Sequence, residues 1–246
     1  MRYLILSDIH ANWEALQAVL ADAEGKYEKI LCCGDIVGYG ANPNEVTEWV
    51  MANAASCVRG NHDKAAAGME DLEWFNPFAR ESALWTQGVM TKENLTYLRF
   101  LEKGPLRLGR VQILHGSPVD EDEYLVGRED AQQVAYYLDV PYSFFGHTHL
   151  QGGFAYHRNG VRLMQRPALH ERRKSLELET GTYYLINSGS VGQPRDTDPR
   201  AAYALYTEGE PLVMLCRTVY DIESAKKKII AAGLPEFLAE RLNAGR

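Results

Sequence analysis

The segment CVRGNHD, from Cys57 to Asp63, sets an amide, an imidazole and a carboxylate side by side directly after a strand-like run and a glycine. Such a cluster is costly inside a core, because buried polar groups need hydrogen-bond partners, but it is ordinary in a surface turn. Taken alone, the residues Gly60 to Asp63 could form a turn held by hydrogen bonds from the Asn and Asp side chains. The rest of the chain contains several clusters of this kind.

Other apolar, strand-like segments also end in polar residues that commonly bind metals. These clusters are Asp8 with His10, Gly34 with Asp35, His115 with Gly116, and Gly146 with His147 and His149. In open α/β sheets, ligands bind outside the carboxyl ends of the strands, so residues distant in sequence can meet in one pocket. Imidazole suits Zn, Mn, Fe, Co and Ni, while a carboxylate adds negative charge and can bridge two ions. The joint pattern therefore predicts a site for a pair of divalent metals.

The N-terminal part of the chain predicts alternating strands and helices. A short apolar run, Tyr3 to Leu6, is followed by apolar side chains at roughly helical spacing through residues 11–24. The unit repeats with a strand at 29–35 and a helix at 42–54, and residues 56–63 then give a third strand and a loop. This order implies parallel pairing in that part of the sheet.

The remaining chain predicts further strands and helices, and we expect one layered α/β domain spanning residues 1–246. The charge-rich segment Leu169 to Glu179 is expected to be a surface hairpin or loop, with a phosphate-facing lid as the alternative. Helices fit 76–87, 91–103, 128–138 and 221–244; strands fit 142–145, 182–190, 201–208 and 211–219; hairpins turn at Gly109 and at Asn159-Gly160.

Composition narrows the classes of partner. A net charge of −7 argues against a general nucleic-acid or anionic-membrane binder, because such proteins need an excess of Lys and Arg. The first apolar run is too short for a signal peptide, and no stretch approaches the roughly 20 apolar residues of a membrane span. The four cysteines form no metal-binding spacing and are expected to be reduced, with Cys32 and Cys33 on opposite faces of a strand. We expect a cytoplasmic protein.

The motifs DIH, GD, GNHD, HG and GHTH, in this order, resemble those of the calcineurin-like metallophosphoesterases, and in particular their small bacterial and archaeal phosphodiesterase-like members. The resemblance runs from the N-terminus to about Arg195. It implies an α/β/β/α sandwich, the metallo-dependent phosphatase fold, in which two mixed β-sheets pack together and helices flank them. It also implies a two-metal centre at the strand ends.

The resemblance implies a role for each motif residue. His62 would bind no metal; it would contact the phosphate and protonate the leaving oxygen as the catalytic acid. Asp35 would bridge the two metals, with Mn²⁺ as our first expectation and Fe, Zn, Co and Ni as alternatives. The other implied ligands are Asp8, His10 and His149 for the first metal, and Asn61, His115 and His147 for the second.

The chain departs from the Ser/Thr phosphatases of this superfamily, which extend the Gly-Asp motif with an Asp-Arg-Gly. Gly38 and Tyr39 stand in those places here, which argues against phosphoprotein substrates. The departure also leaves open which group orients His62, with Asp63 as its neighbour.

Replacement phosphate contacts are expected from Arg59 or Arg195, the latter in the Gly-rich segment NSGSVGQPR. Arg59 could instead be an ordinary surface arginine. Asn12 could cap the first helix or reach the phosphate, and Tyr39 could line the substrate site or only pack. His157 and His170 fall outside every motif.

These features predict a dinuclear-metal-dependent phosphoesterase that hydrolyses a small phosphodiester or phosphomonoester by in-line attack of a metal-bridging hydroxide. A nucleotide pyrophosphohydrolase, as in the diadenosine tetraphosphatase-like relatives, is an alternative. An alternative of another class is a non-catalytic protein-interaction scaffold, because a retromer subunit with this fold resembles the chain more distantly. The expected partner is a small phosphate ester rather than a membrane or a nucleic acid.

Overall fold

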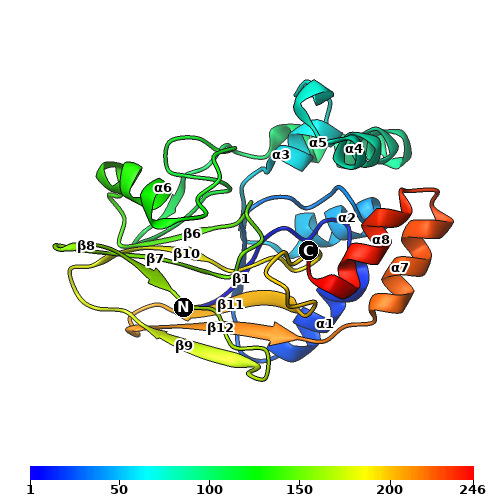
Figure 1. Ribbon diagram of the computed structural model, residues 1–246. Helices are drawn as coiled ribbons and strands as arrows, with labels where there is room; N and C mark the ends of the chain where they lie inside the picture. Colours follow the sequence, from blue (N-terminus) through cyan, green and yellow to red (C-terminus); the bar gives the residue numbers. More distant parts are fainter.

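The computed structural model describes residues 1–246 and contains two six-stranded β-sheets stacked face to face with helices outside them. Figure 1 shows the two sheets one above the other, with helix α6 (Arg128–Gln133) over the second sheet and α1 (Trp13–Ala23) against the first. This arrangement is the α/β/β/α sandwich that the sequence predicted.

The first sheet has the strand order β3-β2-β1-β11-β12-β9. Its first three strands are parallel, as the alternating strands and helices predicted, and β1 pairs antiparallel with β11. The sheet is therefore mixed. Its strands are β1 (Arg2–Leu6), β2 (Lys29–Cys32), β3 (Ser56–Cys57), β9 (Arg173–Glu177), β11 (Ala201–Thr207) and β12 (Leu212–Thr218).

The second sheet has the order β4-β5-β6-β10-β7-β8 and is also mixed, with β5, β6 and β10 parallel. The two hairpins that the sequence predicted are confirmed, because β4 turns into β5 at Gly109 and β7 into β8 at Asn159-Gly160. Its strands are β4 (Leu106–Leu108), β5 (Val111–Ile113), β6 (Tyr142–Phe145), β7 (Gly152–His157), β8 (Gly160–Met164) and β10 (Tyr183–Asn187).

Apolar side chains fill both the space between the sheets and the space under the helices. Cys33 belongs to the cluster between the sheets, whereas Cys32 belongs to the cluster under α1 and α2 (Pro43–Asn53). The prediction that these neighbours point to opposite faces is therefore confirmed. All four cysteines are free.

The remaining helices lie at the edges of this sandwich. Helices α7 and α8 pack on each other and on Tyr39 through the buried Ile229, Leu238 and Leu242. These helices are α3 (Asn61–Ala66), α4 (Pro77–Val89), α5 (Lys92–Phe100), α7 (Ile222–Ala231) and α8 (Glu236–Ala244), with 3-10 turns at Leu72–Trp74 and Ala135–Tyr137.

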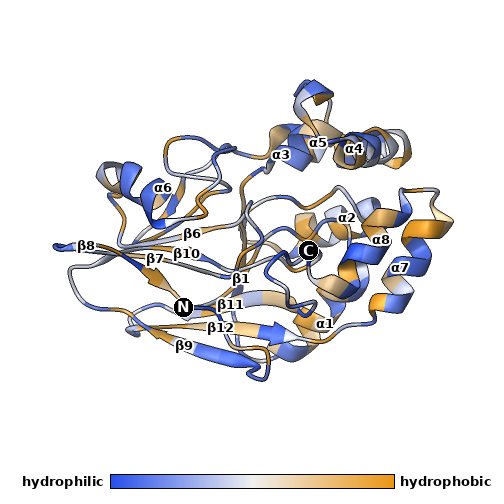
Figure 2. Ribbon diagram, viewed as in Figure 1, coloured by the Kyte–Doolittle hydropathy of each residue, from blue (hydrophilic) through white to orange (hydrophobic).

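Three local predictions were wrong. Residues 61–63 begin helix α3 instead of forming a loop, and the helix expected over 221–244 is broken at Gly233 to Pro235, which leaves Ile230 exposed. Within the segment 169–179, residues 169–172 lie in a loop, as expected, but residues 173–177 form the edge strand β9, paired with β12, rather than a local hairpin or a lid. Figure 2 shows β9 as largely hydrophilic, and charged side chains on an edge strand discourage pairing with other chains.

The helix expected over 128–138 is present only to Gln133, followed by a 3-10 turn. No helix in the structure combines the length and the apolar character that crossing a membrane requires.

The packing between the sheets predicts a large cost for truncating Phe144, which is fully buried there. Phe144→Ala should lower the free energy of unfolding by about 3–5 kcal/mol, because a cavity adds to the lost transfer energy. Urea unfolding followed by circular dichroism measures this. Phe100→Ala is the matched control, since Phe100 is 82% exposed and should change the free energy by about 0.5 kcal/mol or less. Equal losses in the two variants would contradict the described core.

Candidate metal centre

The candidate ligands lie in the loops that follow five strands, where the carboxyl ends of the parallel strands meet. Six of the seven predicted ligands have side chains that are almost completely buried, and Asn61 is partly buried. By loop, they are Asp8 and His10 after β1, Asp35 after β2, Asn61 after β3, His115 after β5, and His147 and His149 after β6.

These loops hold their backbone in an unusual conformation. Eight residues other than glycine have positive φ, and all except Thr197 lie in the loops of the centre. Five of them, with φ between 50° and 62°, are the predicted ligands Asp8, His10, Asp35, His147 and His149. Non-glycine residues adopt this region at an energetic cost, and such residues concentrate at functional sites. The positive φ values thus cost folding stability and direct these side chains inward.

The ligand atoms gather into two groups that share Asp35. One group is Asp8, His10, Asp35 and His149, and the other is Asp35, His115 and His147, with all ligand atoms in a group within 4.8 Å of one another. Oδ2 of Asp35 lies 3.6 Å from Nε2 of His10 and 3.4 Å from Nε2 of His115. Asn61 joins the second group, because its Oδ1 lies 3.3 Å from Nε2 of His115.

Each imidazole in the centre has its outer nitrogen next to a backbone carbonyl, which assigns the proton to that nitrogen. The inner nitrogens are then unprotonated acceptors. The outer contacts are Nδ1 of His10 with Val37 O at 2.9 Å, Nδ1 of His115 with Cys33 O at 2.8 Å, Nδ1 of His149 with Gln193 O at 2.6 Å, and Nε2 of His147 with Asp122 O at 2.9 Å.

The inner nitrogens face one another in pairs. Nε2 of His10 lies 3.1 Å from Nε2 of His149, and Nε2 of His115 lies 3.1 Å from Nδ1 of His147. When both rings of a pair are neutral, two lone pairs at this separation repel unless a cation lies between or beside them. The buried Oδ2 of Asp8 likewise has no hydrogen-bond partner. The donor set therefore fits divalent metal ions, one beside each pair of imidazoles.

The pKa values of the buried groups also indicate a site that favours bound cations. Burial raises the pKa of Asp8 to about 7 and lowers the pKa of His147 to about 3. Burial also opposes a charge on His115, but the adjacent Asp35 carboxylate outweighs it and raises the pKa of His115 to about 10. Without metal, a proton on His115 would thus offset the charge of Asp35. A bound cation would displace that proton and take over its charge.

His62 lies beside the two ligand groups and belongs to neither of them. Its ring centroid is 4.4 Å from that of Tyr39, 5.0 Å from that of His10 and 5.4 Å from that of Phe75. The backbone N–H of His62 donates to Oδ1 of Asp35 at 2.9 Å. Burial lowers the pKa of His62 to about 4, and its Nδ1 has no hydrogen-bond partner. Aromatic packing therefore holds this ring.

Asp63 does not orient His62. Its Oδ1 accepts from the N–H groups of Ile36 and Val37, and its Oδ2 accepts from the N–H of Gly60. The side chain thus fastens the start of α3 to the loop after β2, the loop that carries Asp35. The polar residues of the segment Cys57 to Asp63 therefore have two roles. Asn61 and His62 face the centre, and Asp63 fixes their loop.

Gly38, which stands where the Ser/Thr phosphatases carry the Asp of their Asp-Arg-Gly, packs directly against His62. Gly38 has φ +88°, and a Cβ at this position would lie 2.6 Å from Nδ1 of His62. The imidazole therefore packs against bare backbone. Any side chain at position 38 would push His62 away from the centre.

The four residues predicted to contact the substrate make different contacts in the structure. Arg59 donates two hydrogen bonds of 2.9 Å to Glu121, so its predicted phosphate contact is not supported. Asn12 uses its Oδ1 to cap α1 and its Nδ2 to bind the carbonyl of Gly192, so capping is its observed role. Tyr39 lines the pocket described below, and Arg195 donates to the Tyr39 hydroxyl at 3.2 Å.

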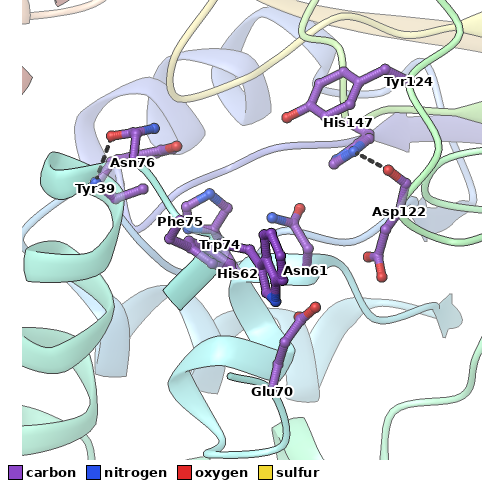
Figure 3. A pocket seen from close by; sticks show the side chains of 11 residues that line it. Tyr39, Asn61, His62, Glu70, Trp74, Phe75, Asn76, Asp122, Tyr124 and His147 are labelled. Carbon is purple, nitrogen blue, oxygen red and sulfur yellow. Dashed lines mark hydrogen bonds between the residues drawn. The ribbon is translucent and has the colours of Figure 1, made fainter. Parts of the chain in front are cut away.

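A cavity of about 290 Å³ opens beside Asn61, His62 and His147. Figure 3 shows His62, Asn61 and Phe75 close together, with Tyr124 and Asp122 on the opposite wall near His147. The sequence motifs did not predict seven of the residues that line the cavity, because these residues lie between the motifs. They are Glu70, Trp74, Phe75, Asn76, Ala79, Asp122 and Tyr124.

Comparisons with known proteins agree with this geometry. The sequence model described as calcineurin-like phosphoesterase matches residues 1–151. The chain belongs to the calcineurin-like phosphoesterase family. It is 40% identical to the uncharacterized protein MJ0912 of Methanocaldococcus jannaschii over 98% of this chain and 97% of that protein. The family is metal-dependent and hydrolyses phosphoester bonds, which accords with the two ligand groups.

Solved structures of the calcineurin-like phosphoesterase fold superpose on nearly the whole chain. The crystal structure of a metallophosphoesterase from Sphaerobacter thermophilus is 38% identical, with a TM-score of 0.86 over 100% of this chain and 99% of that one. A hypothetical protein, PH1004 from Pyrococcus horikoshii OT3, matches with a TM-score of 0.78 and 19% identity over 100% and 98% of the chains. The second likeness concerns the fold alone.

Metal content should separate the two ligand groups. Protein reconstituted with Mn²⁺ and desalted is expected to hold two ions per chain, His115→Ala one, and Asp35→Ala fewer than one, because Asp35 faces both groups. Inductively coupled plasma mass spectrometry gives the count. His157→Ala, which removes an imidazole outside the centre, should keep both ions. An Asp35→Ala protein that also keeps both ions would contradict the shared carboxylate.

The contact between Gly38 and His62 predicts that Gly38→Ala abolishes most phosphoesterase activity while metal content stays unchanged, because the added Cβ displaces the ring. Steady-state hydrolysis of an alkyl phosphate, whose leaving oxygen needs a proton, measures this. Gly109→Ala is the matched control, since Gly109 has φ +71° and nothing within 4 Å of the added Cβ. Similar activities in the two variants would rule out the contact as a determinant of catalysis.

Proposed function

We propose that the chain, as one domain spanning residues 1–246, hydrolyses small phosphate esters with two divalent ions held by the two ligand groups. The observation that carries this proposal is the position of Asp35, whose Oδ2 faces His10 in one group and His115 in the other. Ions held by the two groups would supply a nucleophilic water of lowered pKa and neutralise the phosphate charge. Mn²⁺ is the proposed metal, with Fe, Zn, Co and Ni as alternatives.

The residues of the chain supply the orientation. Backbone carbonyls next to the outer nitrogens of the four imidazoles would leave the inner nitrogens as neutral ligands once the ions bind, and the buried loops would keep bulk solvent away from the centre. A phosphate in the cavity would contact Asn61 and His147 of the second group, and Tyr39 and His62, whose rings pack on His10 of the first group. The ring of His62 lines this cavity, where it would contact the phosphate and hold the proton that the leaving oxygen receives.

A nucleotide is a second candidate substrate, and one observation favours it. Trp74 lines the cavity and is 92% exposed, and Phe75 and Tyr124 also line it. Such aromatic faces can stack on a nucleobase or another aromatic leaving group. A protein-interaction scaffold, the third possibility, would need neither a complete ligand set nor His62.

The cytoplasm remains our proposed location, because all four cysteines are free.

Metal-stripped protein supplied with Mn²⁺ should hydrolyse p-nitrophenyl phosphate or its bis ester, because the ions provide the nucleophile. Release of p-nitrophenolate measures the rate, and the ratio of the two rates distinguishes a monoesterase from a diesterase. His115→Ala should lose the metal-dependent rate. Two bound ions without turnover of either ester would contradict the proposal and favour the scaffold.

Proton donation by His62 should matter most when the leaving oxygen is basic. His62→Ala is expected to keep both metals and to lose about 10²–10⁴-fold in kcat on an alkyl phosphate, the usual contribution of a general acid. The loss should be smaller on p-nitrophenyl phosphate, whose leaving group needs no proton. His157→Ala is the control imidazole. Equal losses on alkyl and aryl esters would remove His62 from the proton transfer.

A further inference from the structure

Two arginines from distant parts of the chain lie over one aromatic ring beside the candidate metal centre. Cζ of Arg195 is 5.7 Å from the ring centroid of Tyr39, and Cζ of Arg241, on α8, is 5.9 Å from the same centroid. The Tyr39 ring lies 4.7 Å from the ring of His10 and 4.4 Å from that of His62. Both positive charges therefore stand next to the centre.

Neither guanidinium pairs with an Asp or Glu side chain. Arg195 donates only to the Tyr39 hydroxyl and to Oε1 of Gln193, each at 3.2 Å, and its buried Nε has no partner. Arg241 donates from Nε to the backbone carbonyl of Arg246. By contrast, the half-buried Arg59, Arg166 and Arg200 and the fully buried Arg217 each pair with an Asp or Glu.

Burial and the neighbouring Arg195 charge lower the pKa of Arg241 to about 10, so the two cations destabilise each other. A half-buried charge without a counter-charge costs stability. An anion bound between or beside the two guanidiniums would offset that cost. The pair thus has the properties of a preformed anion site.

The backbone on both sides holds the pair in place. The loop before Arg195 is tied to the ligand loops, because Gly192 N–H donates to Asp8 O at 3.0 Å and Arg195 N–H to His149 O at 3.4 Å. Helix α8 is anchored by its buried leucines against Tyr39, and the carbonyl of Gly245 accepts from the N–H of Thr197 at 2.8 Å. Little ordering remains to be done when an anion binds.

We propose that Arg195 and Arg241 form an anion clamp that binds a phosphate group carrying two negative charges, and that Arg241 makes the site prefer such a group over a singly charged diester. The inference rests on the proposed function, since it assigns a substrate class to the same site. Guanidinium matches phosphate oxygens in geometry and gives charge-assisted hydrogen bonds. The dianion is either the scissile phosphate of a monoester or a second phosphate next to it.

Binding to the full-length, Mn²⁺-loaded protein tests the clamp without turnover. Isothermal titration calorimetry at pH 8 would compare inorganic phosphate, singly charged dimethyl phosphate and methylenediphosphonate. Arg241→Gln should weaken phosphate binding roughly tenfold or more, the loss of a hydrogen bond to a charged group, and dimethyl phosphate binding by less than about twofold. Arg241→Lys should fall between wild type and Arg241→Gln.

Arg110→Gln is the matched control, because Arg110 lies 5.7 Å over the ring of Tyr142 and, like Arg241, pairs with no Asp or Glu, but it does not contact Tyr39, the ring beside the centre. It should leave all three affinities unchanged. Weakening of methylenediphosphonate alone by Arg241→Gln would place the clamp at a second phosphate. Equal weakening of phosphate and dimethyl phosphate, or no weakening relative to Arg110→Gln, would overturn the proposal.

Hydrolysis rates then separate this proposal from the proposed function. Relative to wild type, Arg241→Gln should lower the ratio of kcat/KM for p-nitrophenyl phosphate to kcat/KM for the bis ester, by a factor similar to its loss of phosphate affinity. If neither ester is hydrolysed by wild type while Arg241→Gln still weakens phosphate binding, the clamp stands and the esterase proposal fails. If wild type hydrolyses esters and the variant leaves the ratio and the affinities unchanged, only the clamp fails.

Discussion

The buried carboxylate of Asp35 is the group on which the rest of the site depends. Its Oδ1 accepts from the backbone N–H of His62, while its Oδ2 faces imidazoles of both ligand groups. A carboxylate that is 1% exposed would be costly without positive charge around it. A proton on His115 can supply one such charge, and metal ions can supply more. The arrangement of the surrounding loops follows from the need to bring cationic partners to this oxygen.

Close backbone contact makes that arrangement possible. A Cβ at Gly60 would collide with the Asp35 carboxylate, and one at Gly38 would collide with His62. The candidate ligands themselves adopt positive φ, a strain that the two packed sheets can absorb because the strand ends are fixed by the core. Asp63 adds three hydrogen bonds between the loops after β2 and β3. Rigid strands thus present strained loops whose side chains converge without a partner chain.

Much of this could be predicted from the sequence, because parallel strands align their carboxyl ends and motif residues there must meet. The sandwich and the gathering of Asp8, His10, Asp35, Asn61, His115, His147 and His149 followed from that rule and from the resemblance. The direction of Asp63 and the engagement of Arg59 with Glu121 did not, because side-chain partners depend on neighbours distant in the chain. The position of Arg241 could not be predicted for the same reason. Its helix shows only an amphipathic pattern, and tertiary packing places Arg241 over Tyr39.

Electron paramagnetic resonance of protein loaded with two Mn²⁺ per chain tests the central claim most directly, because it reports whether two ions share a bridge. Ions held on either side of Asp35 should be magnetically coupled and give a multiline spectrum, which Asp35→Ala should lose. A simple six-line spectrum from both ions in the wild-type protein would mean that they are isolated from each other. That result would contradict a two-metal centre built on Asp35.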